Sequence, residues 1–179
     1  MAEADLIINE LKKCGITHLL GLPDNTSAAL FSLLVNDPDI DIINVTREGE
    51  AFAMASGLWL GGKVPAIVIQ NTGLLESGDA YRGTALRMRV PLLCLITYRG
   101  YARMGDRDTG ASLQTEIDDY SRADIDSAGV VTEPTLRAWA LPYEFLHTNH
   151  DIGKISSASE QAEKESRPVA VLITEHILP

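Results

Sequence analysis

Short apolar segments alternate with longer segments of helical periodicity along the whole chain. Most of these segments are nearly continuous in apolar residues instead of alternating with polar ones, which is typical of strands buried on both faces of a parallel sheet. They span residues 17–21, 40–45, 64–69, 90–96, 142–147 and 168–174. Their order predicts an α/β fold: an open, doubly wound, mainly parallel six-stranded sheet with helices on both faces.

The segments between these strands carry apolar residues at helical spacing. They predict helices at residues 3–14, 26–35, 48–60, 76–88, 133–140 and 155–166. One stretch departs from the alternation, because residues 98–131 hold several glycines and many charges before the next helix. A connection of this length in a compact domain is usually functional. We therefore expect a long functional loop or excursion there, with room for a short helix near residues 113–120.

Composition indicates one globular domain over residues 1–179, since 45% of the residues are hydrophobic and 22% are charged. No apolar run reaches the roughly 18 residues that a membrane span needs, and the acidic start of the chain is unlike a signal peptide. The two cysteines, Cys14 and Cys94, lie in apolar contexts, which predicts packed free thiols. We therefore expect a cytoplasmic protein that does not bind membranes.

Charge is distributed unevenly along the chain. The net charge of −10 argues against nucleic acid and anionic membranes as partners. Residues 82–107, however, contain six arginines, no lysine and a single acidic residue, Asp106. Arginine is the residue that recognises planar or multi-oxygen anions by paired hydrogen bonds. This segment is therefore either an anion-binding region or a solvated helix face with interface ion pairs.

Candidate chemistry lies after the strands, because ligands of open parallel sheets bind outside the carboxyl ends of the strands. The first four strands are followed by residues 21–25, 46–48, 70–73 and 97–100. No glycine-rich dinucleotide or phosphate-binding motif follows them, and no serine-hydrolase elbow is present. The four histidines lack metal-ligand spacing, so we expect no metal site in this chain.

The sharpest single feature is Glu48, which ends a buried strand and opens an alanine-rich helix. A glutamate in the first turn of a helix is also favoured by the helix dipole alone. Glu50 fits that structural explanation equally well. From the residues alone, both a functional and a purely structural reading of Glu48 stay open.

Three motifs at three strand ends resemble those of thiamine-diphosphate enzymes. The first is Glu48-Gly-Glu-Ala-Phe-Ala-Met-Ala-Ser-Gly57 with Gly62-Lys63 after it; the others are Asn71-Thr-Gly73 and Gly21-Leu-Pro-Asp24. Together they cover one domain, the pyrimidine-binding (PYR) domain. The chain is most similar to the separate PYR subunits of the sulfopyruvate and phosphonopyruvate decarboxylase family, and Tyr98-Arg-Gly100 agrees with that narrower assignment.

The resemblance implies a role for each matching residue. Glu48 would be the catalytic residue, hydrogen-bonded to N1′ of the aminopyrimidine and promoting its imino tautomer. The cofactor-binding residues implied are Pro23, Glu48, Asn71, Thr72 and Gly73. The substrate-binding residues implied are Asp24, Asn25, Tyr98, Arg99 and Arg103. Helix capping and turn formation also explain the polar residues among these.

The resemblance also implies what the chain works with. It would be the PYR subunit of a two-subunit 2-oxo-acid decarboxylase that converts a small anionic 2-oxo acid, resembling sulfopyruvate or phosphonopyruvate, to an aldehyde and CO2. The cofactor would be thiamine diphosphate, with Mg2+ held by the partner. That partner would be a β subunit with the diphosphate-binding (PP) domain, in a hetero-oligomer, because this chain lacks the Gly-Asp-Gly motif of that domain.

Departures from the family pattern leave other functions open. The segment from Tyr101 to Gly110 lacks the histidine that we expect in close relatives, and Leu74-Leu-Glu-Ser77 replaces their Gly and Asn. The substrate could therefore be a different 2-oxo acid. The alternatives are a carboligase subunit like acetolactate synthase, a structural or regulatory subunit that has lost catalysis, and an α/β domain that binds another small molecule.

Overall fold

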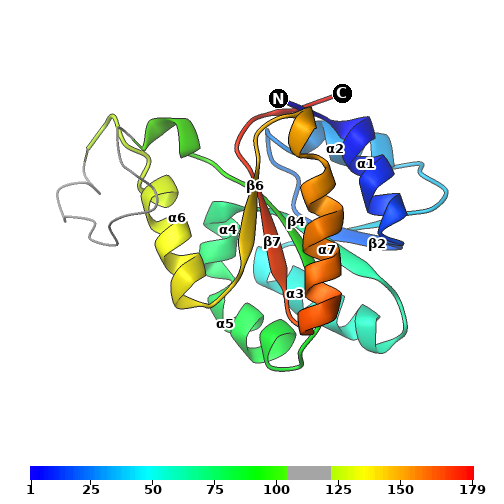
Figure 1. Cartoon of the computed structure of the whole chain (residues 1–179). Helices are drawn as coiled ribbons and strands as arrows, with labels where there is room; N and C mark the ends of the chain where they lie inside the picture. Colours follow the sequence, from blue (N-terminus) through cyan, green and yellow to red (C-terminus); the bar gives the residue numbers. More distant parts are fainter. Residues whose placement is uncertain (105–121) are drawn as a thin grey trace.

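The computed structural model describes residues 1–104 and 122–179 and confirms the parallel α/β architecture (Figure 1). Six strands form one sheet in the order β3-β2-β4-β5-β7-β6, and all five pairings are parallel. The strands are β2 (His18–Gly21), β3 (Asp41–Asn44), β4 (Pro65–Gln70), β5 (Leu93–Thr97), β6 (Tyr143–Leu146) and β7 (Val169–Ile173). Each lies within or one residue beyond its predicted segment.

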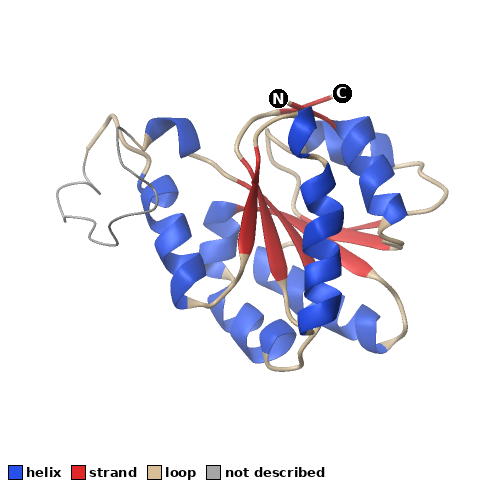
Figure 2. Ribbon diagram, in the orientation of Figure 1, coloured by secondary structure: helices blue, strands red, loops and turns tan. Residues whose placement is uncertain are grey.

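Helices cover both faces of this sheet, as Figure 2 shows. One face carries α1 (Ala4–Lys13), α2 (Ala28–Leu34) and α7 (Gly153–Glu165). The other carries α3 (Glu48–Leu60), α4 (Asn71–Glu76), α5 (Gly78–Ala80), the π-helical turn η1 (Tyr81–Leu86) and α6 (Ser127–Ala138). Two short 3-10 turns, η2 (Tyr101–Arg103) and η4 (Asn149–Asp151), follow β5 and β6.

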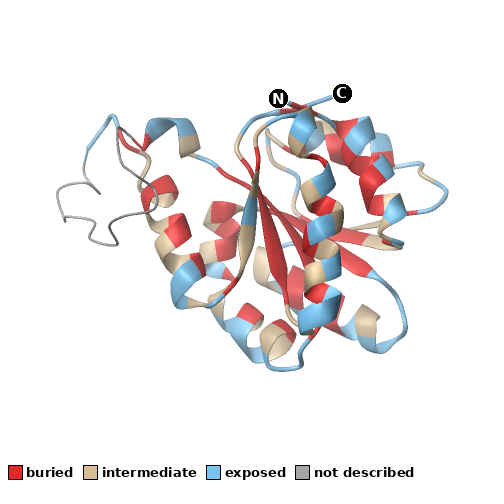
Figure 3. Cartoon of the chain, viewed as in Figure 1, coloured by how far each residue is buried: buried red, intermediate tan, exposed pale blue. Residues whose placement is uncertain are grey.

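The core has two parts, one on each face of the sheet. Along β2, Leu19 packs under α1 and α2, whereas its neighbour Leu20 packs under α3. The central strands β4, β5 and β7 are buried over almost their whole length (Figure 3). Each fully buried Leu or Ile contributes roughly 1.5–3 kcal/mol relative to an exposed one. This burial on both faces explains why the strands are continuously apolar instead of alternating.

The two ends of the chain are paired, which the apolar pattern did not predict. β1 (Ala2–Glu3) runs parallel to β8 (Ile177–Leu178) as a separate two-stranded sheet. These strands are two residues long, too short for any periodicity to reveal them. Figure 1 shows the termini side by side beyond one edge of the main sheet.

Two predicted helices have different boundaries. α6 begins at Ser127, not at residue 133, so the long connection expected over 98–131 is shorter. Its start was obscured by Gly129, a poor helix former, but a Cβ there would overlap the carbonyl of Gly100. The helix expected over 76–88 begins instead at Asn71, directly after β4, and is broken into α4, α5 and η1.

Other predictions have mixed outcomes. The short helix expected near 113–120 lies outside the described residues. Cys14 and Cys94 are both free thiols, as predicted, and burial raises the pKa of the Cys94 thiol. No helix in residues 1–104 and 122–179 combines the length and the apolar character needed to cross a membrane.

Candidate functional site

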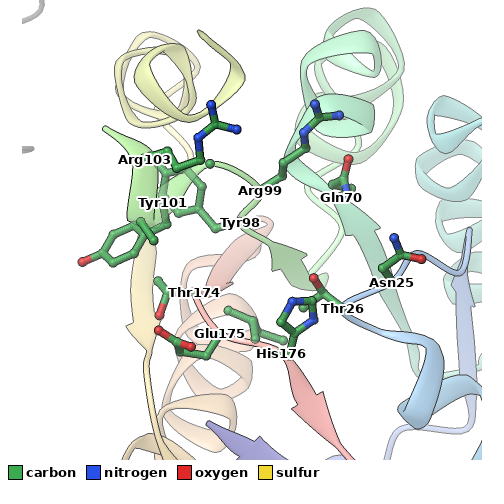
Figure 4. A pocket seen from close by; sticks show the side chains of 13 residues that line it. Asn25, Thr26, Gln70, Tyr98, Arg99, Tyr101, Arg103, Thr174, Glu175 and His176 are labelled. Atoms are coloured by element: carbon green, nitrogen blue, oxygen red, sulfur yellow. The ribbon is translucent and has the colours of Figure 1, made fainter. Parts of the chain in front are cut away.

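The carboxyl ends of β2, β4, β5 and β7 meet at one edge of the sheet and surround a pocket of about 460 Å³. Its wall combines charged and polar side chains with the main chain of the loop after β5 (Figure 4). Residues that line it include Asn25, Thr26, Gln70, Tyr98, Arg99, Tyr101, Arg103, Thr174, Glu175 and His176. The pocket lies where the sequence predicts ligand binding.

Glu48 is the first residue of α3 and is half-buried. Its side chain lies over Gly73 in the first turn of α4, because a Cβ built at Gly73 would overlap the Cγ, Cδ and Oε1 of Glu48. Any residue but glycine at position 73 would therefore displace the carboxylate. Glu48 and Gly73, predicted as separate parts of one cofactor site, are in direct contact.

The predicted turn Asn71-Thr-Gly73 is in fact the beginning of a helix. Gln70 ends β4 in extended backbone and α4 starts at the next residue. A helix that starts directly at a strand end brings its first turn against the start of α3, where Glu48 lies. The Thr72 hydroxyl donates a hydrogen bond of 2.8 Å to Gln70 Oε1 and is half-buried.

Glu50, which fits the helix-dipole explanation as well as Glu48 does, stabilises the start of α3. Its carboxylate accepts hydrogen bonds of 3.0 Å from the backbone N–H and the hydroxyl of Thr46, and a longer one from the N–H of Arg47. The Thr46 bonds lower the pKa of Glu50. Glu50 therefore satisfies donors at the N-terminus of α3, while the carboxylate of Glu48 has no hydrogen-bond partner among the described residues.

Glu76, at the end of α4, ties that helix to the start of α3. One carboxylate oxygen pairs with the guanidinium of Arg47, and the other accepts from the backbone N–H of Gly49 at 3.3 Å. Arg47 and Gly49 flank Glu48 on both sides. The ion pair therefore holds the two helix ends whose contact places Glu48 on Gly73.

Asn71 is fully buried and is bonded through both ends of its amide. Its Oδ1 accepts from the backbone N–H of Arg99 at 3.1 Å, and its Nδ2 donates to the Arg99 carbonyl at 3.0 Å. Nδ2 also donates to the Thr132 hydroxyl at 2.8 Å. Asn71 thus joins the ends of β4 and β5 to α6.

Asp24 and Asn25, predicted near the substrate, differ in exposure. The Asp24 carboxylate accepts from the backbone N–H groups of Thr26 and Ser27 and from the Thr97 hydroxyl. It therefore closes the turn before α2 and joins β2 to β5. Asn25 is exposed and points into the pocket (Figure 4).

Pro23 lies away from this pocket. It lines a second hollow of about 420 Å³ between α2 and β3, together with Phe31, Val35 and Asn44. The structure therefore does not bring Pro23, predicted as a cofactor contact, into the pocket lined by the predicted substrate residues Asn25, Tyr98, Arg99 and Arg103.

The loop after β5 supplies the cationic wall of the pocket. Arg99 donates from Nε to Asp126 at 3.1 Å, yet its side chain is 59% exposed. Arg103 donates to the carbonyl of Ala123 at 2.6 Å and is also exposed. Both guanidiniums keep N–H donors for an anion. Arg107, from the same arginine-rich segment, lies outside the described residues.

Tyr98 is mainly a core residue although it lines the pocket. It is 4% exposed, and its hydroxyl donates to the Gly129 carbonyl at 2.9 Å. Burial raises the pKa of this hydroxyl. Its ring contacts Tyr101 and stacks on Phe145. Tyr98 therefore supports the loop that carries the two arginines.

The polar residues that follow β7 in the pocket were not predicted: they are Thr174, Glu175 and His176. The available signal was the same rule that selected the first four strand ends, because the last strand also ends at this edge. His176 was considered only as a metal ligand, a role that its spacing did not support.

Comparisons with known proteins point to decarboxylases. A phosphonopyruvate decarboxylase of Streptomyces viridochromogenes is 34% identical over 105 residues, which are 59% of this chain and 26% of that protein. The sulfopyruvate decarboxylase subunit alpha of Methanococcus maripaludis is 26% identical over 174 residues, 97% of this chain and 95% of that subunit. The chain thus spans about a quarter of the Streptomyces protein and nearly all of the Methanococcus subunit.

A solved structure supports the fold. The 2-oxoglutarate:ferredoxin oxidoreductase of Magnetococcus marinus matches 96% of this chain and 28% of its own, with a TM-score of 0.66 and 17% identity. The family model described as thiamine pyrophosphate enzyme, N-terminal TPP binding domain, matches residues 1–122. Since this match covers more than half of the chain, the protein belongs to the family of thiamine pyrophosphate enzyme N-terminal, TPP-binding domains.

Proposed function

We propose that this chain is the PYR subunit of a thiamine-diphosphate-dependent 2-oxo-acid decarboxylase, with Glu48 as its catalytic carboxylate. The observation that carries the proposal is the position of Glu48 on Gly73 at the carboxyl edge of the sheet. Relatives named sulfopyruvate and phosphonopyruvate decarboxylase support the reaction class. The alpha-subunit names support a partner, which we propose to be a PP-domain β subunit in a hetero-oligomer.

The residues around Glu48 fit the aminopyrimidine ring of thiamine diphosphate. Gly73 has no side chain, which leaves room for the Glu48 carboxylate where α3 and α4 begin. The neighbouring acids Glu50 and Glu76 are occupied by protein donors, whereas Glu48 has no such partner in the described part of the chain. A half-buried carboxylate without a protein partner is free to bind a ring nitrogen.

In this proposal each side chain has a defined task. Glu48 would hold a hydrogen bond to N1′ of the aminopyrimidine and move a proton there. Gly73 would leave space for that carboxylate, and Asn71 and Thr72 would shape the first turn of α4 beneath it. Pro23 is proposed as a further cofactor contact. Thiamine diphosphate, when bound, supplies the electron sink for loss of CO2. The partner would hold Mg2+ and the diphosphate.

The substrate is proposed to be a 2-oxo acid with a second anionic group, of the sulfonate or phosphonate kind. Arg99 and Arg103 face the pocket with exposed guanidiniums, whose paired N–H donors suit a multi-oxygen anion. Asn25 would contact the substrate directly. Asp24 and Tyr98, whose polar groups are bonded within the protein, would shape the pocket.

The test begins with the chain isolated from its native cell under mild conditions, so that a partner and cofactor come with it. In the assembled complex, Glu48→Gln should lower the turnover of sulfopyruvate or phosphonopyruvate roughly 100- to 10,000-fold, the usual range for loss of a general acid–base group. Glu50→Gln is the matched control and should keep most activity. Wild-type turnover in Glu48→Gln would overturn the proposal.

Product analysis in the same assay separates the reaction types. A decarboxylase releases a free aldehyde, whereas a carboligase yields a hydroxyketone from the same 2-oxo acid. A chain that assembles tightly with a partner but depends on no cofactor would instead be a structural subunit, and the proposed activity would be wrong.

A further inference from the structure

The wall of the pocket opposite the arginine loop is made by the end of the chain. Thr174, Glu175 and His176 follow β7 and line the same pocket as Arg99 and Arg103. In Figure 4 the imidazole of His176 lies beside Thr26 and across the pocket from Arg99.

The segment that carries His176 is anchored at both ends. On one side, Thr174 donates its N–H to the Leu146 carbonyl at 3.2 Å, and its hydroxyl bonds to the ring of His147 at 2.8 Å. On the other side, Ile177 donates to the Thr26 carbonyl at 3.2 Å and pairs through β8 with β1. Only Glu175 and His176 lie between these anchors, so the main chain that carries the imidazole is held at the pocket wall.

The charges in the pocket leave His176 available to an anion. The ring of His176 has no hydrogen-bond or ion-pair partner among the described residues, and the residue is exposed. Among residues 1–104 and 122–179, the charged residues lining the pocket with it are the cations Arg99 and Arg103 and the anion Glu175. Arg99 and Arg103 each use one N–H donor in a hydrogen bond within the protein, to Asp126 and to the Ala123 carbonyl. A doubly charged ligand would therefore find unused donors on both walls.

We propose that His176 is a specificity-determining residue that hydrogen-bonds the second anionic group of the substrate, opposite Arg99. The proposal rests on the proposed function and adds a residue and a basis for substrate choice. A protonated imidazole donates a charge-assisted hydrogen bond to a sulfonate or phosphonate oxygen. A 2-oxo acid without the second charge has no group for this bond. His176 thus favours doubly over singly charged substrates.

The first test compares His176→Gln with His150→Gln in the assembled complex. His150 is exposed and does not line this pocket, which makes it a matched control. For sulfopyruvate, His176→Gln should raise KM roughly 10-fold or more, the usual effect of losing a hydrogen bond to a charged group. Turnover at saturation, and KM for pyruvate, should stay within about twofold of wild type.

A second test needs neither partner nor turnover. Sulfoacetate, an unreactive dianion, is titrated into the full chain while the histidine ring resonances are followed by NMR. A saturable shift of the His176 resonance with sulfoacetate, and none with acetate, supports the role of His176 in binding the second anionic group. Absence of that shift overturns it.

The outcomes also separate this inference from the proposed function. If Glu48→Gln is inactive while His176→Gln keeps a wild-type KM for sulfopyruvate, only the role of His176 is wrong. If His176→Gln raises KM for sulfopyruvate and pyruvate equally, the residue has no part in choosing the charge, and the inference is also overturned. Wild-type activity in Glu48→Gln contradicts the proposed function itself, whatever His176 does.

Discussion

The two halves of the candidate site are held in very different ways. In the first, which we call the acid half, Glu48 lies in contact with Gly73 where two helices begin. In the second, the cation half, Arg99, Arg103 and His176 are exposed around the pocket. The acid half tolerates little change at position 73, since a side chain there would take the space of the carboxylate. The side chains of the cation half can adjust.

The contrast between the halves indicates which part of the proposed reaction each one controls. A carboxylate that must meet one ring nitrogen needs a fixed position, because a misplacement of about 1 Å can cost roughly 100-fold in rate. Long cationic side chains around a pocket accept anions of several shapes. Changes in the acid half should therefore affect turnover, and changes in the cation half should affect which substrate is used.

The largest effect is expected for Gly73→Ala. The new Cβ would overlap the carboxylate of Glu48 and push it away, so turnover in the assembled complex should fall about 100-fold or more. The fold should persist, because alanine is a good helix former at this position of α4. Gly57→Ala is the matched control, since a Cβ there meets nothing within 4 Å. Equal turnover in both variants would contradict the fixed acid half.

Asn71→Ala should act mainly on stability, with a smaller effect. The substitution removes the amide that bonds to the N–H and carbonyl of Arg99 and to the Thr132 hydroxyl. The Thr132 hydroxyl keeps its bond to the Ala128 carbonyl, and the Arg99 N–H keeps one to the Thr97 carbonyl, so the Arg99 carbonyl loses most. Loss of these bonds should cost about 1–3 kcal/mol, to be measured as the free energy of unfolding in urea. Asn25→Ala, at an exposed position, should change it by less than about 0.5 kcal/mol. If Asn71→Ala lowers the free energy of unfolding no more than Asn25→Ala does, the amide bonds of Asn71 do not couple β5 to α6.

The fold could be predicted from the chain because its central strands are buried on both faces. Segments such as residues 64–69 and 168–174 are continuous in apolar residues for that reason, and their order predicts parallel pairing. Helix boundaries were less predictable where tertiary contacts override local preference. α6 begins at Ser127 although Gly129 and Pro134 disfavour helix, because Gly129 packs against Gly100.

The site could be predicted only in part, because its geometry depends on residues far apart in sequence. The residues alone do not distinguish the roles of Glu48 and Glu50. The distinction rests on the hydrogen bonds from Thr46 to Glu50, which the sequence of a first helical turn does not predict. Asn71 meets Thr132 across 61 positions. His176 reaches the pocket because β8 pairs with the other end of the chain. Such contacts follow from packing, not from spacing.

The smallest effect is expected for Glu76→Gln, which tests how far the acid half depends on its surface ion pair. The variant removes the charge facing Arg47 but keeps an acceptor for the N–H of Gly49. The Arg47 side chain is 71% exposed, and exposed ion pairs contribute at most about 1 kcal/mol. Turnover should therefore fall no more than about fivefold, with KM for the substrate unchanged.

Asp79→Asn, which removes the charge of the neighbouring surface pair with Arg82, is the control and should leave turnover unaltered. Glu76→Ala, which also removes the acceptor of Gly49, should lower turnover further than Glu76→Gln, because the start of α3 then loses its tie to α4. If all three variants turn over substrate at the wild-type rate, the contact of Glu48 with Gly73 is sufficient by itself. The rigidity of the acid half would then lie in backbone packing and not in the charges around it.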